Sequence, residues 1–317
     1  MVARAAGSAR RPSCPPPLDG AGASVDTSPV PQAAAELVTF CLEHPATSIS
    51  EPDVRLVLER LTRGPEGVFD LASPGGARLV AALIELAESD DDMAELIPLG
   101  VRGGDGLEGL LGEAVDRALA LARTGTRRLF RVPLGPCLAE QRPVLEARGL
   151  GAAFSSTSMA TPDARWAPTP TPDGLVFEDW RADHGTSAIH ALVRAAFAGN
   201  PGVIHLPEEE LVQRLASSVP KPRLLFDGAV LVGLSRTRGP EADGVGTVQM
   251  IARDPRARGR RLGDVLLSEA QRVLAEAGAT RFALEVLTDN TSALALYRRH
   301  GFEVVSVETT FQRGVHG

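Results

Sequence analysis

Several residue types and patterns are scarce or missing in this sequence of 317 residues. It has no run of about 18 apolar residues, the length that a membrane-spanning helix needs, so we expect none. No apolar stretch follows the arginines near the N-terminus, so we expect no secretory signal. Only three cysteines are present, without CxxC spacing. We therefore expect neither a disulfide framework nor a bound metal such as zinc, and a reducing, cytoplasmic location.

Lysine and tyrosine each occur once, as Lys221 and Tyr297, against 32 arginines. The formal charge of −7 argues against a nucleic-acid-binding surface, although it leaves room for a local basic patch. An apolar fraction of 44% suffices for a buried core, and the length suits about two domains of roughly 150 residues. We therefore expect a globular monomer or homodimer with no nucleic-acid or membrane partner.

Two proline-rich stretches divide the chain. Residues 1–33 are rich in Pro, Ser, Gly and Ala and lack apolar periodicity, which predicts a disordered tail. Residues 161–173 contain repeated prolines and predict a stiff, extended linker. The remaining segments, 34–160 and 174–317, are similar in length, and each is expected to form one domain.

The two long segments resemble each other when the second is moved back by 152 positions. Leu231-Val232 then falls on Leu79-Val80, and Arg299-His300-Gly301-Phe302 falls on Ala147-Arg148-Gly149-Leu150. Both segments have the same predicted order of elements: helix, helix, strand, strand, strand, helix, strand, helix, strand. The sequence therefore predicts an α/β fold built from a diverged internal repeat.

Apolar periodicity places the elements of the second segment. Asp227-Gly228 is a hairpin signal between two strands. Apolar residues recur at helical spacing from Leu262 to Ala277, and Gly278 stops this helix. The predicted elements are strands over 224–226, 229–235, 247–252, 282–286 and 304–311, and helices over 262–277 and 292–300.

The loop from Arg253 to Gly263 carries five arginines and one aspartate, a net charge of +4 in an acidic chain. It lies between a strand and a helix. A glycine turn with free N–H groups, a helix N-terminus and flanking arginines is typical of a pyrophosphate site. The equivalent loop of the first segment, 101–108, has a charge of −1 and is four residues shorter. This difference favours an anion site over a solvated basic loop, in the second segment only.

A second motif contains, in order, Asn290, Ala293, Tyr297, Gly301 and Phe302. Together with Arg258 and Gly263 in the basic loop, it resembles the motifs of the GCN5-related N-acetyltransferase (GNAT) superfamily. These motifs are Arg/Gln-x-x-Gly-x-Gly/Ala after a strand, and later Asn-x-x-Ala-x-x-x-Tyr-x-x-x-Gly-Phe. The later motif matches at every position. The resemblance implies two tandem GNAT-like domains, each a mixed, mostly antiparallel sheet flanked by helices.

One position departs from the first motif: Arg261 stands where its middle glycine is usual. That glycine allows the backbone to approach the pyrophosphate closely. Either Gly259, two residues earlier, restores the flexibility, or Arg261 supplies charge in place of a bare amide.

By this resemblance the protein moves an acetyl group from acetyl-CoA to a primary amine of a small molecule, by direct transfer in a ternary complex. The strand ending at Arg253 would hold the pantetheine arm, and the loop after it the pyrophosphate. Tyr297 would be the catalytic general acid that protonates the departing thiolate. A phenol with its ordinary pKa of about 10 stays protonated at neutral pH. The implied acetyl-CoA-binding residues are Met250, Ile251, Ala252, Arg253, Arg258, Gly259, Arg260, Arg261, Leu262, Gly263, Asp264, Asn290 and Ala293.

The first segment lacks these functional groups. Leu145 and Leu138 stand at the positions equivalent to Tyr297 and Asn290, and neither leucine can transfer a proton or donate a hydrogen bond. We therefore predict a degenerate first domain, which supports the structure or shapes the substrate cleft.

The base that accepts a proton from the amine stays open among three alternatives. Glu285 lies on the strand that leads to Asn290, and His205 lies where the family usually places residues that face the substrate. A water relay is the third. His190 has apolar neighbours at helical spacing, which indicates a structural role, and Glu208–Glu210 is typical of a solvated helix start.

Two other functions are open at this point. Replacement of the middle glycine by Arg261 would suit a regulatory protein that binds acyl-CoA without catalysis. The basic loop could instead bind nucleic acid, although one loop in an acidic chain is a small footprint. An assay for release of the CoA thiol separates the enzyme from both.

Overall fold

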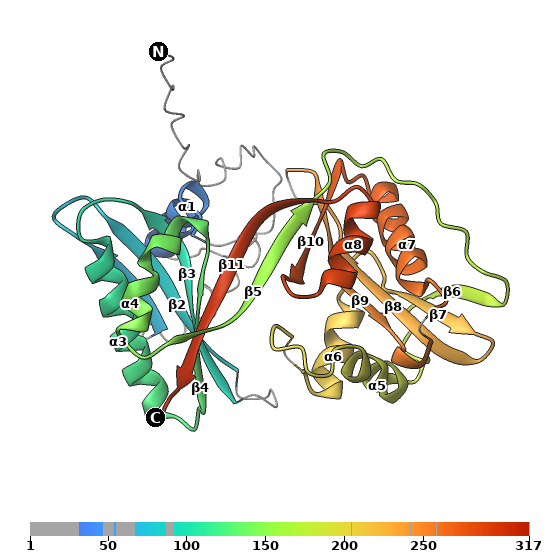
Figure 1. The fold of residues 1–317 in the computed structure, drawn as a ribbon, viewed down its shortest axis with the longest axis horizontal. Helices are drawn as coiled ribbons and strands as arrows, with labels where there is room; N and C mark the ends of the chain where they lie inside the picture. Colours follow the sequence, from blue (N-terminus) through green and yellow to red (C-terminus); the bar gives the residue numbers. More distant parts are fainter. Residues whose placement is uncertain are drawn as a thin grey trace, which may run out of the picture.

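The computed structural model describes residues 32–46, 54, 67–86, 92–203, 205–240, 243–257 and 259–316. In these residues eleven strands form one mixed sheet, in the order β1-β2-β3-β4-β11-β5-β10-β9-β8-β7-β6. Helices flank the sheet in two groups, and β5 and β11 cross the middle between them (Figure 1). The expected α/β class, with a mixed sheet flanked by helices in each half, is confirmed.

The described part of the first half follows the predicted order of elements. It contains α1 (Gln32–Glu43), β1 (Val68–Ala72), β2 (Arg78–Leu86), β3 (Met93–Arg102), α3 (Leu107–Thr124), β4 (Leu129–Leu134), the short helices η2 (Pro136–Gln141) and α4 (Arg142–Glu146), and β5 (Gly151–Ala160). Residues 1–31 of the predicted tail lie outside the described residues, and the last two residues of that tail belong to α1.

The second half adds one strand to the prediction. It contains β6 (Leu175–Asp179), α5 (Thr186–Ala196), α6 (Glu208–Ala216), β7 (Arg223–Asp227), β8 (Val230–Arg238), β9 (Val245–Arg253), the turn η3 (Pro255–Ala257), α7 (Leu262–Glu276), β10 (Arg281–Leu287), α8 (Thr291–Arg299) and β11 (Glu303–Gly314). The unpredicted strand is β6, a five-residue edge strand paired only with β7. Its weak alternation, with Val176 exposed, gives too little pattern for a prediction.

The internal repeat appears in the pairing of the strands. β3 pairs with β4 in parallel from Met93 and Leu129, and β9 pairs with β10 in parallel from Val245 and Arg281. Met93 and Val245 are 152 positions apart (245 − 93), as are Leu129 and Arg281 (281 − 129). The offset read from the sequence therefore relates the same parallel pair in both halves.

The two halves exchange their last strands. β5 ends the first half but pairs with β10, and β11 ends the second half but pairs with β4; β5 and β11 also pair with each other. The C-terminus accordingly lies beside β4, among the elements of the first half (Figure 1). The boundaries at 34–160 and 174–317 stay predictions, because the exchange joins both segments into one sheet.

Each half buries one face of its long amphipathic helix against the sheet. Leu111, Val115 and Ala122 of α3 are completely buried, and so are Leu267 and Leu274 of α7. These residues recur at spacings of four or seven, which places them on one stripe of each helix. The stripe directs α3 onto β2 and α7 onto β8 and β9, so the N-terminus of each helix lies next to the strand that precedes it.

The proline-rich linker is docked on α7 rather than free. The Thr169 N–H donates to Ser268 Oγ at 2.9 Å, and Trp166 packs against the core beneath α7 and α8.

One expectation about the cysteines is wrong. Cys41 is buried and free, but Cys137 is disulfide-bonded. Spacing along the chain could not predict this pairing, because a disulfide depends on distances in the folded chain.

Candidate active site

β9 and β10 are parallel neighbours only over their first residues. Their pairing ends at Val248 and Leu284, although β9 continues to Arg253 and β10 to Leu287. Beyond that point each strand stays paired on its outer side, β9 with β8 and β10 with β5. The two strands therefore diverge, and the backbone of residues 249–253 has no strand partner on the side of β10 among the described residues.

A β-bulge marks the place where the strands diverge. The register between β8 and β9 shifts between Arg236 and Thr237, so Gln249 is an extra residue on β9. Bulges bend a strand and redirect its backbone groups. This bulge turns residues 250–253 away from β10 and opens the wedge. The side chains of Met250 and Ala252 pack toward α5 and α6, so only their backbone is available to the wedge.

The basic loop joins the end of β9 to the N-terminus of α7. Gly259 has φ 82° and Arg261 has φ 55°, both in the left-handed region. Arg261 therefore adopts the conformation for which the missing glycine would be suited, at a cost of about 1–2 kcal/mol. The replacement has kept the backbone path of the loop.

This path leaves backbone donors free at the helix N-terminus. The N–H groups of Gly259, Arg260, Arg261 and Gly263 donate to no acceptor among the described residues. Consecutive free N–H groups at the positive end of a helix dipole form a ready anion site. The geometry therefore fits the pyrophosphate that the sequence predicted here.

Two arginines of this loop are neutralised by aspartates. Asp254 is buried and accepts three hydrogen bonds from the Arg256 guanidinium and one from its N–H, which holds the pKa of Asp254 below its usual range. Arg260 pairs with Asp227 of the β7–β8 turn at 2.5 Å. These two arginines shape the loop, a role that sequence reasoning missed. Arg258 lies outside the described residues.

The first turn of α7 lies against α8. A Cβ at Gly263 would come within 3.1 Å of Leu296, so the small residue allows this approach. Asp264 accepts from Arg299 at 3.1 Å and lies 3.3 Å from His300 Nε2. Burial alone would raise the pKa of Asp264, but these hydrogen bonds outweigh it and hold the pKa below its ordinary value. The two predicted motifs are thereby brought together.

Asn290 and Tyr297 occupy the two ends of α8. Asn290 is the N-cap: its side-chain oxygen accepts from the Ala293 N–H at 3.2 Å, which stabilises the helix start. Tyr297 is packed in the core below α7 and α8, with its ring 6.1 Å from that of Phe302. Burial raises the pKa of Tyr297 to about 12 rather than the ordinary 10, so its hydroxyl stays protonated throughout the physiological range.

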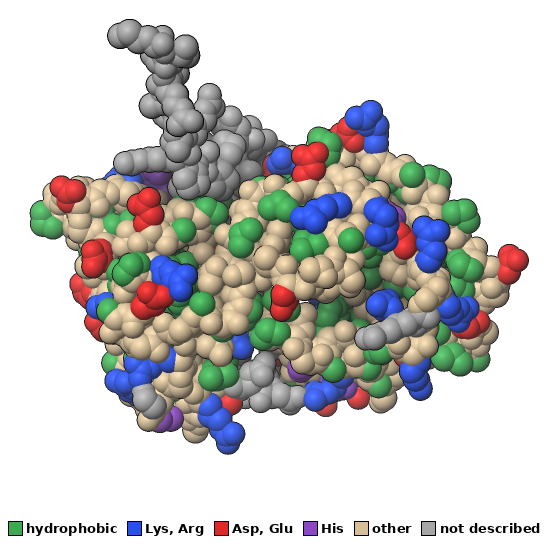
Figure 2. Space-filling model, viewed as in Figure 1, with side chains coloured by type: hydrophobic (Ala, Val, Ile, Leu, Met, Phe, Trp, Pro, Cys, Tyr) green, Lys and Arg blue, Asp and Glu red, His purple; other side chains and the backbone are tan. Residues whose placement is uncertain are grey.

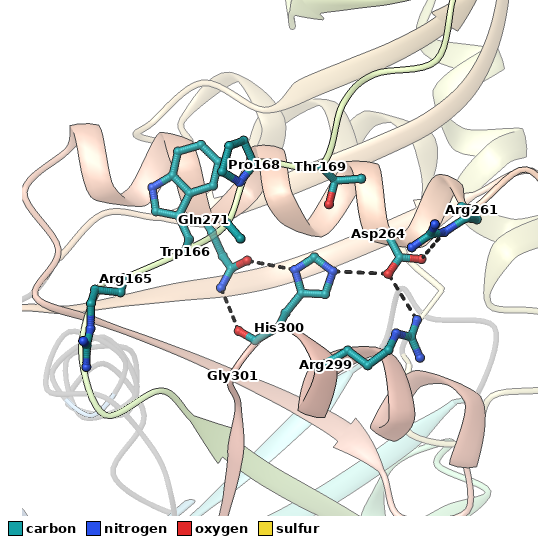
Figure 3. A pocket seen from close by; sticks show the side chains of 11 residues that line it. Arg165, Trp166, Pro168, Thr169, Arg261, Asp264, Gln271, Arg299, His300 and Gly301 are labelled. Carbon is teal, nitrogen blue, oxygen red and sulfur yellow. Dashed lines mark hydrogen bonds and ion pairs between the residues drawn. The ribbon is translucent and has the colours of Figure 1, made fainter.

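A pocket of about 640 Å³ lies where the linker crosses the ends of α7 and α8 (Figure 3). Asp264, Gln271 and His300 form its floor, and Gln271 Nε2 donates to the His300 carbonyl oxygen at 3.2 Å. Arg261 and Arg299 stand at its rim (Figure 3). Basic side chains gather on the same face over α7 and α8 (Figure 2). The pocket therefore adjoins the basic loop. Sequence reasoning missed the linker residues that line the pocket, because only the fold places them there.

The candidate bases lie apart from each other. Glu285 is exposed on the face of β10 opposite to the buried Phe282, as the alternation predicted. His205 lies in the loop between α5 and α6, and its Nδ1 is buried without a hydrogen-bond partner in the described part of the chain. His190 Nε2 lies 3.0 Å from the Leu206 carbonyl oxygen, which agrees with a structural role. Glu208 starts α6 and accepts from Ser187 at 2.9 Å, so it is bound to the start of α5.

In the first half the equivalent wedge is filled. Pro45 bridges to Gly100 of β3, and the Ala46 N–H donates to the Leu99 carbonyl oxygen at 3.2 Å. A Cβ on Gly135, directly after β4, would overlap the Ala46 carbonyl oxygen. Residues 44–46 therefore lie between β3 and the end of β4, in the space that the second half leaves open.

The anion loop of the first half is covered as well. Ser73 Oγ donates to the Asp105 carbonyl oxygen at 2.5 Å, and Gly76 bridges to Asp105. The β1–β2 turn thereby packs on the loop that precedes α3. Leu138 and Leu145 are completely buried in the core of this half.

An open wedge between parallel strands, followed by an anion site at a helix N-terminus, is the arrangement that the resemblance to acyl-CoA-dependent acetyltransferases implies. Comparison with known proteins agrees. Residues 207–302 match the model of the acetyltransferase (GNAT) family. A mycothiol acetyltransferase of Streptomyces avermitilis is 30% identical over 294 residues, which cover 89% of this chain and 93% of that protein. Another, from Mycolicibacterium gilvum, is 28% identical over 75% of this chain and 80% of that protein.

Solved structures share the fold. A GCN5-related N-acetyltransferase from Sphaerobacter thermophilus superposes with a TM-score of 0.68 at 19% identity, covering 91% of this chain and 94% of that one. A tandem GNAT protein from the clavulanic acid biosynthesis pathway has a TM-score of 0.60 at 16% identity, covering 89% and 94%. The chain belongs to the GNAT family of N-acetyltransferases, with acetyl-CoA as the acetyl donor. None of the described helices is long and apolar enough to cross a membrane.

Proposed function

We propose that this protein acetylates a primary amine of a small molecule at the wedge between β9 and β10, by direct transfer in a ternary complex. The observation that carries the proposal is the open wedge beside an anion site, with Tyr297 on the adjoining helix. Residues 250–253 would hold the pantetheine arm through their backbone, as a further strand would. The free N–H groups of Gly259, Arg260, Arg261 and Gly263 would hold the pyrophosphate. The pocket rimmed by Arg261 and Arg299 would receive the nucleotide end.

The chemistry needs one base and one acid. The acceptor ammonium first gives a proton to the base, and the neutral nitrogen then attacks the thioester carbonyl carbon. The carbon–sulfur bond breaks, the sulfur takes the electron pair, and Tyr297 supplies the proton that makes it a thiol. Burial keeps the Tyr297 proton in place until the thiolate forms. After the attack, the nitrogen carries one proton more than the amide product keeps. The nitrogen loses this extra proton and the tyrosinate takes up one proton, so the reaction is balanced.

The acceptor class rests on the relatives. Mycothiol acetyltransferases align over most of this chain. The layout of the sequence is also similar to mycothiol synthase, which makes the mycothiol precursor amine a specific alternative for the substrate. A small-molecule amine is the broader proposal, because no motif in the chain is specific to mycothiol chemistry.

A direct assay tests the proposal. We expect release of free CoA thiol from acetyl-CoA in the presence of a panel of small primary amines, with one amide formed per thiol. Tyr297→Phe removes only the phenolic hydroxyl and should lower turnover about 10²-fold or more, with acetyl-CoA binding almost unchanged. Leu145→Met, the equivalent position of the first half, is the matched control and should retain turnover.

Three results would count against the proposal. Acetyl-CoA binding without turnover for any amine would favour the regulatory alternative. Equal losses of binding and turnover in Tyr297→Phe would show that the ring packs and does not donate a proton. Binding of nucleic acid that persists at saturating acetyl-CoA and falls steeply with salt would favour the third function.

A further inference from the structure

Residues 200–203, between α5 and α6, form a turn that lies at the mouth of the wedge. A Cβ on Gly202 would lie 3.1 Å from Leu287 Cδ2 and 3.5 Å from the Phe154 ring. Leu287 is the last residue of β10, and Phe154 belongs to β5, the strand that pairs with β10 on its outer side. The 200–203 turn therefore packs on β10 where this strand has already diverged from β9.

The 200–203 turn lies on the face of the sheet opposite to Tyr297. Leu284 and Val286 of β10 are buried in the core beneath α7 and α8, where Tyr297 also packs. Successive residues of a strand project to opposite faces, so Leu287 projects away from that core and toward the turn. A thioester in the wedge would thus have the proposed acid on one face and the turn on the other. An acceptor amine would reach the thioester between the wedge and the turn.

Local hydrogen bonds give the 200–203 turn its shape. The Asn200 side-chain oxygen accepts from the Gly202 N–H at 2.9 Å, and the Asn200 carbonyl oxygen accepts from the Val203 N–H at 3.3 Å. The Asn200 N–H donates to the Phe197 carbonyl oxygen at 3.0 Å. An asparagine side chain that binds the backbone two residues later favours a turn. Because all these bonds are local, they shape the turn but do not fix its place over the wedge.

A side chain of the first half fixes that place. Arg131 of β4 donates from Nη1 to the Pro201 carbonyl oxygen at 3.1 Å, although 70 residues separate the two along the chain. Its Nε donates to Gln312 Oε1 at 3.3 Å, and its guanidinium carbon lies 5.4 Å from the centre of the Phe154 ring. Gln312 and Phe154 thereby orient the guanidinium toward Pro201.

Burial makes this contact hard to replace. Arg131 is 7% exposed, so water has little access to its hydrogen-bonding groups. A hydrogen bond from a charged donor is about twice as strong as a neutral one. If the turn moved away from the wedge, Nη1 of Arg131 would lose its acceptor in a buried place, which is costly. The contact therefore stabilises one position of the 200–203 turn.

The equivalent strand of the second half does not carry this arginine. β4 and β10 are equivalent in the repeat, and the position 152 residues after Arg131 is Ala283 (131 + 152 = 283). The methyl group of an alanine is too short to reach a loop above the sheet. The long cationic side chain thus belongs to the half with the closed wedge, and it contacts the half with the open one.

We propose that Arg131 is a positioning residue for the acceptor amine. It holds the 200–203 turn over the mouth of the wedge, and this turn forms the wall of the acceptor site opposite to Tyr297. This inference rests on the proposed function and extends it, because it gives the first half a part in the reaction. Arg131 touches no reacting atom. Its loss should therefore weaken productive binding of the amine and leave acetyl-CoA binding unchanged.

Steady-state kinetics of CoA thiol release tests the role of Arg131. The probe is whichever of pentylamine, benzylamine and glucosamine gives the wild-type chain the highest kcat/KM, used at saturating acetyl-CoA. Arg131→Met removes the charge and the donors but keeps an unbranched apolar stem. We expect the KM for the amine to rise about tenfold and kcat to fall less than about threefold. The Kd for acetyl-CoA, measured by calorimetry, should stay within about twofold of the wild-type value.

Two further variants serve as rescue and control. Arg131→Lys keeps the charge and one donor for Pro201, so it should return the amine KM to within about threefold of the wild-type value. Arg128→Met is the same substitution at an exposed arginine just before β4 and should change none of the three constants.

A fourth variant loosens the turn without touching the contact between the two halves. Asn200→Ala removes the acceptor of the Gly202 N–H and should raise the amine KM in the same direction as Arg131→Met. The double variant should raise the KM less than the product of the two single effects, because both substitutions release the same turn. Asn200→Ala also decides the question if Arg131→Met does not fold.

The outcomes separate this inference from the proposed function. An unchanged amine KM in Arg131→Met or in Asn200→Ala would overturn the positioning role. A loss of acetyl-CoA affinity as large as the rise in amine KM would overturn it as well, since Arg131 would then support the second half as a whole. No thiol release by the wild-type chain with any of the three amines would contradict the proposed function, and this failure is visible before any variant is made.

Discussion

The two halves of the molecule use the same strands differently. In the second half the parallel strands β9 and β10 diverge and leave a wedge, whereas in the first half residues 44–46 fill the space between β3 and β4. The loop before α7 leaves N–H groups free, whereas the loop before α3 is covered by the β1–β2 turn. One fold thus supports either a binding site or a closed core, depending on what occupies the wedge.

One residue position shows how the difference is encoded. Gly135 follows β4, and the position 152 residues later is Leu287, at the end of β10. Glycine allows the Ala46 carbonyl group to approach the backbone, and a larger side chain would exclude it. The filled wedge of the first half therefore requires a small residue, whereas the open wedge of the second half tolerates a leucine.

The largest expected effect concerns the number of acetyl-CoA sites. Because only one of the two wedges is open among the residues that the structure describes, titration calorimetry should give one acetyl-CoA per chain. Hydrogen exchange should show protection of the amides at the start of α7 on binding, and none at the start of α3. A stoichiometry of two would contradict the comparison, since it would require residues 44–46 to leave the first wedge.

The seam between the halves should show a pH effect. Glu308 lies on the strand that the second half gives to the first, and its pKa of about 7 lies above the ordinary 4.5. The folded state therefore binds this proton more tightly, so stability falls as pH rises from about 4.5 to 7. The full shift corresponds to at most about 3 kcal/mol, since one pKa unit is about 1.4 kcal/mol.

Urea denaturation at pH 4.5 and pH 8 measures this effect. Glu308→Gln should be more stable than the wild-type chain at pH 8 and nearly equal to it at pH 4.5. A constant difference at both pH values would mean that the substitution changes packing and not ionisation.

Filling the space at Gly135 should disturb the closed wedge. Gly135→Ala places a methyl group against the Ala46 carbonyl oxygen. We expect a loss of about 2 kcal/mol in the free energy of unfolding, typical of overpacking at a rigid position. Gly109→Ala on α3, where nothing lies within 4 Å, is the control and should stabilise by about 0.5–1 kcal/mol. If both substitutions have the same sign in urea denaturation, residues 44–46 are not held rigidly in the wedge.

The smallest expected effect is at Arg261, where the second half departs from the glycine of its family. Arg261→Gly should relieve the left-handed strain and raise the free energy of unfolding by about 1 kcal/mol, measured by thermal denaturation. Arg261→Ala removes the same charge but keeps the strain. Weaker acetyl-CoA binding in both variants would show that the charge contributes to binding. Weaker acetyl-CoA binding in Arg261→Ala alone would show that the loss comes from the backbone conformation and not from the lost charge.

Local features were predictable from the sequence. The helices at 262–276 and 291–299 and the strands around them follow from apolar periodicity and from Gly278 at the end of the first helix. These signals act over a few residues, so the chain carries them wherever it folds. The four extra residues before α7 were also visible, since four residues separate β3 from α3 (103–106) and eight separate β9 from α7 (254–261).

The pairing of arginines in the basic loop was less predictable. A count of charges suggested five free cations, but Asp254 and Asp227 engage two of them. Asp227 is 33 residues from Arg260 along the chain, and only the β7–β8 turn brings it near. The linker was predicted as an extended spacer, but Ser268 and the core beneath α7 dock it.

The sequence by itself determined the two halves, the order of their elements and the motif that holds Asn290 and Tyr297. It determined these because caps, turns and periodicity are local properties of the chain. Only the tertiary structure decided the exchange of β5 and β11, the filling of the first wedge and the pairing of Arg260 with Asp227. Those features depend on the strand order and register of the whole sheet, and no short stretch of sequence contains that information.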